Sequence, residues 1–313
     1  MRHLRPQNGL ATSSPWSKTT RITTRTFCNS LPKHDFSPFT RRLYKLPTAP
    51  TPTTQHNSLP TFLTYASRTA LPQTSTVYVG THYEYTVLNA LRRYALSLHR
   101  IGGRDDAGID LLGTWHLPTR ERERAVRVLV QCKALKTKLG PNLVRELEGA
   151  LRQAPVGWRT GETAGVLVSP REATKGVRDT LARSSYPLFW LLVERDGVLK
   201  QALWNSRAEV LLGLDPLAVE NRYGAQLDGS VTSQVALTWD GCDVPNLEEV
   251  EAGLARGERE WVRSWGLELS EIGEDELLDV VEGIFPNGWP EVGADEMVAE
   301  EHRARVVRAL QKH

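Results

Sequence analysis

The sequence predicts a mixed α/β fold, in which a sheet with both antiparallel and parallel strands is flanked by helices. Three observations predict it: an amphipathic helix pattern around residue 84, two strand patterns at residues 109–112 and 126–135, and two apolar strand patterns at 165–169 and 188–193 with a helix pattern between them. Hairpin strands followed by a strand–helix–strand crossover form a mixed sheet of this kind.

Length and composition are those of a globular core with additional segments. The chain has 313 residues, of which 40% are hydrophobic and 24% charged, which argues against disorder throughout. No run approaches the roughly 18 apolar residues of a membrane-spanning helix, so we expect no membrane span. The three cysteines form no C-x-x-C pair. They exclude a disulfide scaffold and a cysteine-rich zinc module, and they fit a reducing compartment.

Charge is distributed unevenly along the chain. Residues 1–70 hold ten Lys/Arg and one acid, for a net charge of +9. Residues 71–239 hold 22 Lys/Arg and 17 acids, for +5, and residues 240–313 hold seven Lys/Arg and 19 acids, for −12. The chain therefore has a basic leader, a mildly basic middle and an acidic tail.

The leader, residues 1–70, is rich in Arg, Ser, Thr and Pro and shows no period that could bury a face. We therefore expect it to be disordered. The Arg-rich, Ser-rich and acid-poor composition is typical of organelle transit peptides. We interpret the segment as a mitochondrial transit peptide followed by a Pro/Thr-rich linker, which predicts a mitochondrial protein of the matrix. A generic disordered N-terminus is the alternative.

The first helix pattern, residues 81–100, places an acid among apolar side chains. Glu84 falls in the middle of a stripe formed with Val87, Leu88 and Leu91. An unpaired carboxylate there would cost several kcal/mol, so we expect a cation nearby. The alternative is that the first turn lies beyond the core edge, where Glu84 favours the positive end of the helix dipole. Both interpretations stay open on the sequence alone.

The second strand pattern places two polar residues on one face. In a strand over 126–135 the side chains of Gln131 and Lys133 share a face, about 6 to 7 Å apart, because side chains alternate with a period of two. Cys132 points to the other face, and we interpret it as a small core residue. A helix after Pro141, the strand 165–169 and a helix over 174–183 follow.

If Asp110 faces the same way on the neighbouring strand, then an acid, an amide oxygen and an ammonium converge. Carboxylate and carbonyl oxygens hold Mg²⁺. The ion acidifies a bound water and neutralises the charge that develops on phosphorus. A lysine beside it can orient the attacking water. Asp110, Gln131 and Lys133 therefore predict hydrolysis of phosphodiester bonds. The alternative is structural: Asp110 ends a turn, Gln131 is solvated, and Lys133 pairs with Glu84.

These motifs resemble a known superfamily. The motifs are G-I-D at 108–110, V-Q-C-K at 130–133, G-T-H-Y-E at 80–84, G-V-L-V-S at 165–169 and T-K-G at 174–176. Together they are similar to the Mrr-like branch of the PD-(D/E)XK nucleases, which includes restriction endonucleases. With the basic leader, the chain is most similar to the fungal mitochondrial family called required for respiratory growth protein seven.

The resemblance covers roughly residues 77–195 and implies a restriction endonuclease-like αβββαβ core. It implies that Asp110 is the metal-binding acid, that Gln131 takes the place of the second acid, and that Lys133 is the catalytic lysine. Glu84 would be an additional acid near Mg²⁺ or Mn²⁺, more important because Gln131 is neutral.

Basic residues near these motifs suggest a path for nucleic-acid phosphates, although a solvated face explains them as well. They are Arg104, Lys136, Lys138 and Arg145. After a domain over 77–225, residues 240–313 predict an acidic, mostly helical extension. DNA would repel this extension, which instead covers the basic face or binds a basic protein partner. Whether the chain forms a homodimer stays open.

The leading functional prediction is a mitochondrial, metal-dependent endonuclease that acts on DNA and supports respiratory growth and genome maintenance. The rival prediction is a nucleic-acid-binding or assembly factor that keeps the nuclease fold without turnover, which the neutral Gln131 makes credible. An RNA-processing nuclease is a weaker third prediction.

Overall fold

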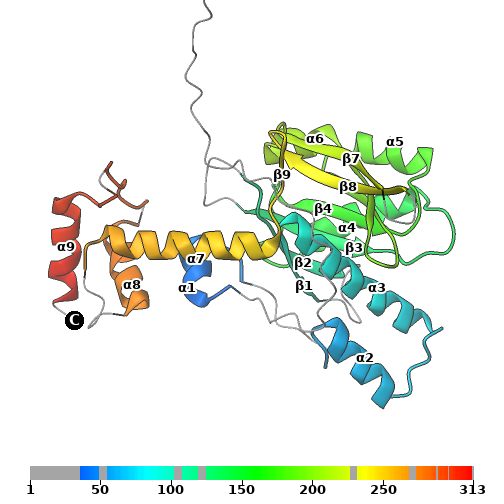
Figure 1. The fold of residues 1–313 in the computed structure, drawn as a ribbon, viewed down its shortest axis with the longest axis horizontal. Helices are drawn as coiled ribbons and strands as arrows, with labels where there is room; N and C mark the ends of the chain where they lie inside the picture. The colour runs from blue at the N-terminus through cyan, green and yellow to red at the C-terminus, as the bar shows by residue number, and fades with distance from the viewer. Residues whose placement is uncertain are drawn as a thin grey trace, which may run out of the picture. The chain divides into compact units, whose positions relative to one another are not determined.

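The computed structural model describes residues 36–48, 55–101, 108–118, 125–225, 231–267, 273–286, 288–294 and 296–311. Its larger sheet has six strands in the order β1-β2-β3-β4-β5-β6. Figure 1 labels β1 to β4 of this sheet. The strands are β1 (Leu96–Arg100), β2 (Leu111–Trp115), β3 (Val126–Cys132), β4 (Ala164–Ser169), β5 (Leu188–Val193) and β6 (Leu199–Trp204). The predicted mixed α/β class is confirmed.

The sheet is mixed because its connections differ in kind. β1, β2 and β3 pair antiparallel, whereas β3, β4 and β5 pair parallel through helical crossovers. β6 returns antiparallel to β5. Every residue of β4 and β5 is buried, as expected of strands covered on both faces. The predicted bounds 188–193 for the last strand are those of β5.

Helices cover the two faces of the sheet. α3 (Thr76–Leu91) packs on the face that carries Val128, Val130 and Val166. α4 (Asn142–Gln153) and α5 (Lys175–Arg183) pack on the opposite face, which carries Leu129 and Leu167. The alternation along β3 is the predicted one, and Cys132 packs against the α3 side. The order helix, three strands, helix, strand also agrees with the sequence prediction.

The prediction of one helix over residues 81–100 is wrong in its second half. α3 ends at Leu91, a 3₁₀ turn follows at Arg92–Tyr94, and Ala95 takes a left-handed conformation with φ of 64°. β1 then begins at Leu96. The apolar residues of this segment fit both periods, and pairing with β2 decides for the strand, since Leu98 lies opposite Gly113. A Cβ at Gly113 would overlap the backbone of β1.

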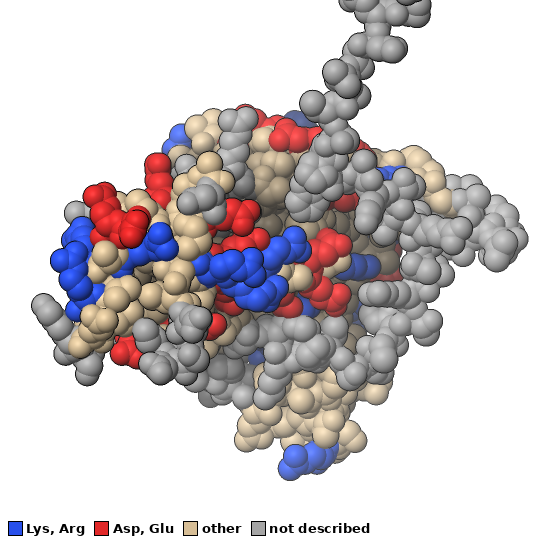
Figure 2. Space-filling view, turned by 60° about the vertical axis from the view of Figure 1, so that its left-hand side comes forward, with Lys and Arg blue, Asp and Glu red and all other residues tan. Residues whose placement is uncertain are grey.

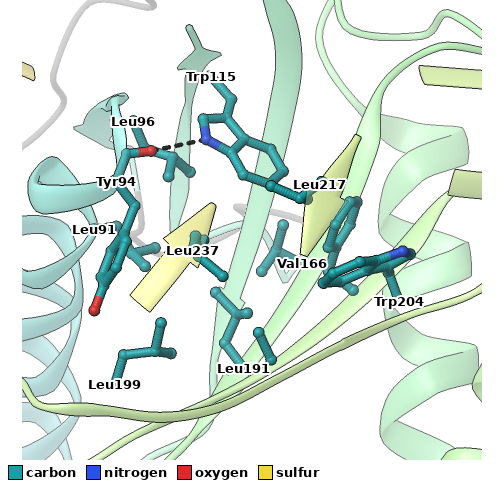
Figure 3. A pocket seen from close by; sticks show the side chains of 12 residues that line it. Leu91, Tyr94, Leu96, Trp115, Val166, Leu191, Leu199, Trp204, Leu217 and Leu237 are labelled. Atoms are coloured by element: carbon teal, nitrogen blue, oxygen red, sulfur yellow. Dashed lines mark hydrogen bonds between the residues drawn. The ribbon is translucent and has the colours of Figure 1, made fainter. Parts of the chain in front are cut away.

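Beyond β6 the chain forms α6 (Ser206–Leu212) and a second sheet of β7 (Leu217–Ala225), β8 (Val231–Trp239) and β9 (Cys242–Asp243), none of which was predicted. A small cavity lies where this sheet meets the first one (Figure 3). Trp115 Nε1 donates to Tyr94 O at 2.8 Å in its wall. Apolar and aromatic side chains without a carboxylate or amine line the cavity, so it offers no site for chemistry.

The segment over 1–70, expected to be disordered, contains two packed helices. α1 (Pro38–Leu43) buries Phe39 and Leu43, and α2 (Leu59–Arg68) buries Phe62 and Ala66. Ser58 caps α2 in a capping box with Thr61. The expectation is therefore wrong for these residues, because short apolar stretches fold when they find a partner surface. Residues 1–35 lie outside the described residues.

The C-terminal part is helical, as predicted. It consists of α7 (Leu247–Ser264), α8 (Glu274–Ile284) and α9 (Glu300–Leu310). Their buried contacts include Trp265, Leu277 and Val306. Among the described residues, none of the helices has the length and hydropathy that crossing a membrane requires.

Candidate functional site

Asp110 is held rigidly one residue before β2. Its N–H donates to Val130 O at 3.0 Å, and its carbonyl oxygen accepts from Ile101 N at 3.0 Å. The carboxylate Oδ2 accepts a hydrogen bond from the backbone N–H of Cys132 at 2.6 Å. These contacts fix Asp110 beside the end of β3, just before Lys133.

Gln131 lies in the adjacent strand at the same level. Leu111 pairs with Val130, and the N–H of Asp110 also donates to Val130 O, so Asp110 lies beside the end of β3 that carries Gln131. The side chain is only 2% exposed, and its Oε1 is buried without a hydrogen-bond partner among the described residues. Its Nε2 lies 2.9 Å from where a Cβ on Gly108 would be, and Gly108 has φ of +79°. Only glycine fits that turn beside the amide.

Lys133 follows β3 directly and is anchored by its N–H, which donates to Val168 O at 2.8 Å. Alternation sets its side chain on the face of Gln131. Its Nζ pairs with Glu146 Oε2 of α4 at 3.0 Å, and Asn142 Nδ2 donates to Glu146 Oε1 at 3.3 Å. The lysine is one quarter exposed, so its ion pair can open toward a ligand without unfolding.

Glu84 reaches the sheet from α3 and meets a cation, as expected. Arg100 Nε of β1 donates to Glu84 Oε2 at 2.5 Å, and the two side chains are 8% and 12% exposed. Arg100 also lies over the ring of Tyr85, 5.7 Å from its centroid. Its Nη1 is buried without a partner among the described residues. The cation beside Glu84 is therefore Arg100, and Lys133 pairs elsewhere, so the alternative of a Lys133–Glu84 pair is wrong.

The pKa of the Cys132 thiol depends on its burial and on the charged side chains near it. Burial raises the pKa of Cys132 well above its usual value, and the negative charges of Asp110 and Glu84 raise it further. Arg100 and Lys133 act on the same pKa in the opposite direction. Asp110, Glu84, Arg100 and Lys133 thus all influence the pKa of this one thiol. A neutral thiol here is inert, in agreement with its interpretation as a core residue.

The donor set fits a hard divalent cation in part. Gln131 Oε1 is a buried acceptor oxygen in need of a partner, and Asp110 supplies a carboxylate one strand away. Glu84, predicted as a third ligand, is instead neutralised by Arg100. No group of three or more His, Cys, Asp or Glu suited to a metal ion occurs in the part of the chain that the structure describes.

The structure describes three of the four basic residues that were predicted to contact nucleic-acid phosphates. Lys136, Lys138 and Arg145 are exposed, whereas Arg104 lies outside the described residues. The loop that carries Lys136 and Lys138 is tied to the start of α5, because Thr174 Oγ1 donates to Leu139 O at 3.0 Å. Arg145 lies in α4. Binding of nucleic acid by these residues stays a prediction.

Sequence reasoning missed two residues that shape the site, Arg100 and Glu146. Arg100 follows Leu96 and Leu98 with a period of two, so the alternation of β1 could have revealed it. Glu146 lies four residues after Asn142 on a helix face, but nothing in the sequence links that face to Lys133.

The fold and these residues define a mixed α/β protein with one charged, half-buried site at the ends of β2 and β3. The family model for required for respiratory growth protein 7 matches residues 75–125 and 119–221 of this chain. The relative from Eremothecium gossypii that bears this family's name is 30% identical over 197 residues, covering 47% of this chain and 81% of that protein. The chain belongs to the required for respiratory growth protein 7 family, as the sequence motifs predicted.

Two further relatives agree. The mitochondrial required for respiratory growth protein 7 of Saccharomyces cerevisiae is 27% identical over 175 residues, covering 43% of this chain and 72% of the relative. An uncharacterized mitochondrial protein of Schizosaccharomyces pombe is 34% identical over 156 residues, covering 49% of this chain. The matched part spans 61% of that relative's length. No solved structure matches the chain. The relatives are named mitochondrial, so the predicted mitochondrial localisation is confirmed.

Proposed function

We propose that this chain is a mitochondrial, Mg²⁺-dependent endonuclease that hydrolyses phosphodiester bonds in DNA on a restriction endonuclease-like core. The observation that carries the proposal is the pairing at the end of the hairpin. The N–H of Asp110 donates to Val130 O and its carboxylate accepts from Cys132 N, so Asp110 lies beside Gln131, and Lys133 follows two residues after Gln131. Mn²⁺ would serve in place of Mg²⁺, because both accept oxygen ligands.

Asp110 and Gln131 would hold the ion, whose contribution when bound is to acidify a water and to neutralise charge on the phosphoryl oxygens. The hydrogen bond from Cys132 N keeps the Asp110 carboxylate oriented. Burial of Gln131 Oε1 without a partner keeps an acceptor ready at that point. Lys133 would leave Glu146 to orient the attacking water and to stabilise the charge that develops on the phosphate.

Glu84 and Arg100 play a supporting part in this proposal. Their pair is buried beside the same Cys132 thiol that Asp110 and Lys133 influence. It adds no net charge to the site, so it leaves the Asp110 charge to attract the cation. Arg100 Nη1, buried and unpartnered among the described residues, donates toward bound phosphate in this account.

The relatives' name connects the proposal to respiratory growth. A nuclease of the mitochondrial matrix would support respiration by maintaining the mitochondrial genome. Lys136, Lys138 and Arg145 would bind the phosphates on either side of the scissile bond, because exposed cations release counterions from nucleic acid.

A second candidate is a nuclease-fold factor that binds nucleic acid in mitochondria without cutting it. The pairing of Glu84 with Arg100 favours this candidate, because it withdraws one of the two carboxylates that a metal site of this kind would use. Such a protein would still present Lys136 and Lys138.

One experiment separates the two candidates. Purified full chain is incubated with labelled single- and double-stranded DNA and matched RNA, with Mg²⁺, with Mn²⁺ or with chelator. The proposal predicts cleavage of DNA that chelator abolishes and that Asp110→Asn removes. Retention of DNA in chelator without cleavage under any condition would contradict it and support the binding factor. Preferential cleavage of RNA would instead indicate RNA processing.

A further inference from the structure

The acidic α8 carries a basic segment of the same chain. Arg42 Nη2 of α1 lies 2.5 Å from Asp279 Oδ1 and 2.8 Å from Glu282 Oε2, and Arg42 Nη1 lies 3.8 Å from Asp275 Oδ1. Lys/Arg and Asp/Glu side chains adjoin one another on the face shown in Figure 2. The hydrogen bonds from Arg42 to Glu282 and Asp279 raise the pKa of the Arg42 guanidinium. Part of the charge asymmetry of the sequence is thus neutralised within the molecule.

Apolar contacts seat this segment more firmly than the charges do. Phe39, Leu43, Tyr44 and Leu46 are buried in one cluster, together with Val262 of α7 and Leu278 of α8. The ring of Phe39 meets the edge of Trp261, with centroids 6.0 Å apart, and Lys45 Nζ lies 5.6 Å from the centroid of Trp289.

The position of Tyr44 requires a glycine at residue 257 of α7. Its hydroxyl donates to Leu254 O of α7 at 3.1 Å. A Cβ on Gly257, one turn further along α7, would overlap Tyr44 Oη. Gly257 has an ordinary helical backbone, so its lack of a side chain is needed for the contact with Tyr44 and not for its own conformation.

The segment also touches the central sheet. Phe36 packs edge-on against His116, with ring centroids 5.1 Å apart, just after β2. Thr40 Oγ1 donates to Glu258 of α7. Residues 36–48 therefore join α7 and α8 to the end of β2.

We propose that residues 36–48 stay in the mature protein as a docking segment for α7 and α8, and that any cleavage of the mitochondrial leader occurs upstream of Phe36. The inference rests on mitochondrial localisation and not on nuclease activity. By composition, Arg41, Arg42 and Lys45 belong to the basic leader. A cut after Leu46 would expose Leu278 and Val262 and leave three acids of α8 without Arg42.

The direct test is mass spectrometry of the N-terminal peptide of the protein purified from mitochondria. We expect its first residue at Phe36 or upstream, including an uncleaved chain. A first residue anywhere after Phe36 would overturn the proposal.

A matched pair of glycine substitutions tests the docking in solution. Gly253→Ala and Gly257→Ala both lie in α7, and a Cβ on Gly253 would meet nothing within 4 Å. Alanine favours a helix over glycine, so Gly253→Ala in the full chain should raise Tm by about 2 °C. Gly257→Ala should lower Tm, because its Cβ displaces Tyr44. An equal rise in Tm for both variants would show that the segment is not docked.

Discussion

Opposite charges meet in two regions of this molecule, under different conditions. At the ends of β2 and β3, Glu84 and Arg100 are 12% and 8% exposed, and buried polar atoms of Arg100 and Gln131 have no partner among the described residues. On α8, Arg42 is 35% exposed and its three acidic partners between 45% and 71%. The first arrangement costs stability, whereas the second adds a little.

The difference indicates what each region is for. A chain that only needed to fold would fill the ends of β2 and β3 with apolar residues, which often stabilise a core more than a buried ion pair does. A buried acceptor oxygen such as Gln131 Oε1, which has no partner in the part of the chain that the structure describes, is expected where a ligand supplies the partner. The exposed charges of α1 and α8 only orient a contact that apolar side chains provide.

The largest expected effect separates the two arginines. Arg100→Gln leaves Glu84 buried without its cation and should lower the free energy of unfolding by about 3–5 kcal/mol. Arg42→Gln, the matched variant in the exposed region, should lower it by about 1 kcal/mol or less. Urea unfolding of both variants measures the difference. Equal losses would show that burial does not distinguish the two pairs.

Next in size is the effect of Asp110 on cleavage. Asp110→Asn keeps the shape of the side chain but removes the charge that would hold the metal, so DNA cleavage should fall by roughly 10²–10³-fold, or about 3–4 kcal/mol. Asp215→Asn, at an exposed turn residue, is the control and should cleave at the parent rate. Undiminished cleavage by the Asp110 variant would remove it from the site.

The contact of α1 with the sheet predicts a pH dependence. Burial, aided by the positive charge of Arg41, lowers the pKa of His116 to about 4. The unfolded chain takes up this proton near pH 6.5, so it binds more protons than the folded chain between pH 6.5 and 4. Stability conferred by neutral His116 is therefore complete above pH 6.5 and is lost as the pH falls toward 4, by about 3 kcal/mol at most.

His116→Phe removes this titration and keeps a ring against Phe36. Thermal unfolding between pH 7.5 and 4.5 should show a flatter profile for the variant than for the parent. Parallel profiles would mean that His116 is not buried against Phe36.

The smallest expected effect concerns Gln131 and has the opposite sign. Gln131→Leu replaces an amide whose buried Oε1 has no partner among the described residues by an apolar side chain of similar size, so the free energy of unfolding should rise by about 1–2 kcal/mol. The same variant should lose cleavage. If the Gln131→Leu variant is more stable and inactive, the parent protein gives up stability at Gln131 for function. If the variant is less stable than the parent, the Gln131 amide supports the fold.

Local patterns carried much of the fold and part of the site. The alternation along β3 was enough to place Gln131 and Lys133 together, and the apolar stripe of α3 raised a cation near Glu84 as one of two open interpretations. Arg100 was missed because the segment was predicted as helix, whereas the left-handed Ala95 ends the helical part and the strand β1 begins at Leu96. Contacts between distant segments, such as Lys133 with Glu146, leave no local trace.

The docking of α1 was missed for a related reason. Its composition is that of the leader, and its apolar residues are too few to bury a face alone. They pack mainly against α7 and α8, which lie more than 200 residues further along the chain; Thr40 and Glu258, for example, are separated by 218 positions. The composition of residues 1–70 as a whole does not reveal a short segment such as α1, because α1 folds in contact with α7 and α8.

The central claim is that Asp110 and Gln131 form a divalent-ion site at the ends of β2 and β3. Calorimetric titration of the full chain with Mn²⁺ tests it most directly, without relying on cleavage. The account predicts one bound ion per chain, lost in Asp110→Asn, weakened in Gln131→Leu and unchanged in Asp215→Asn. Absence of binding, or binding that both site variants retain in full, would contradict it.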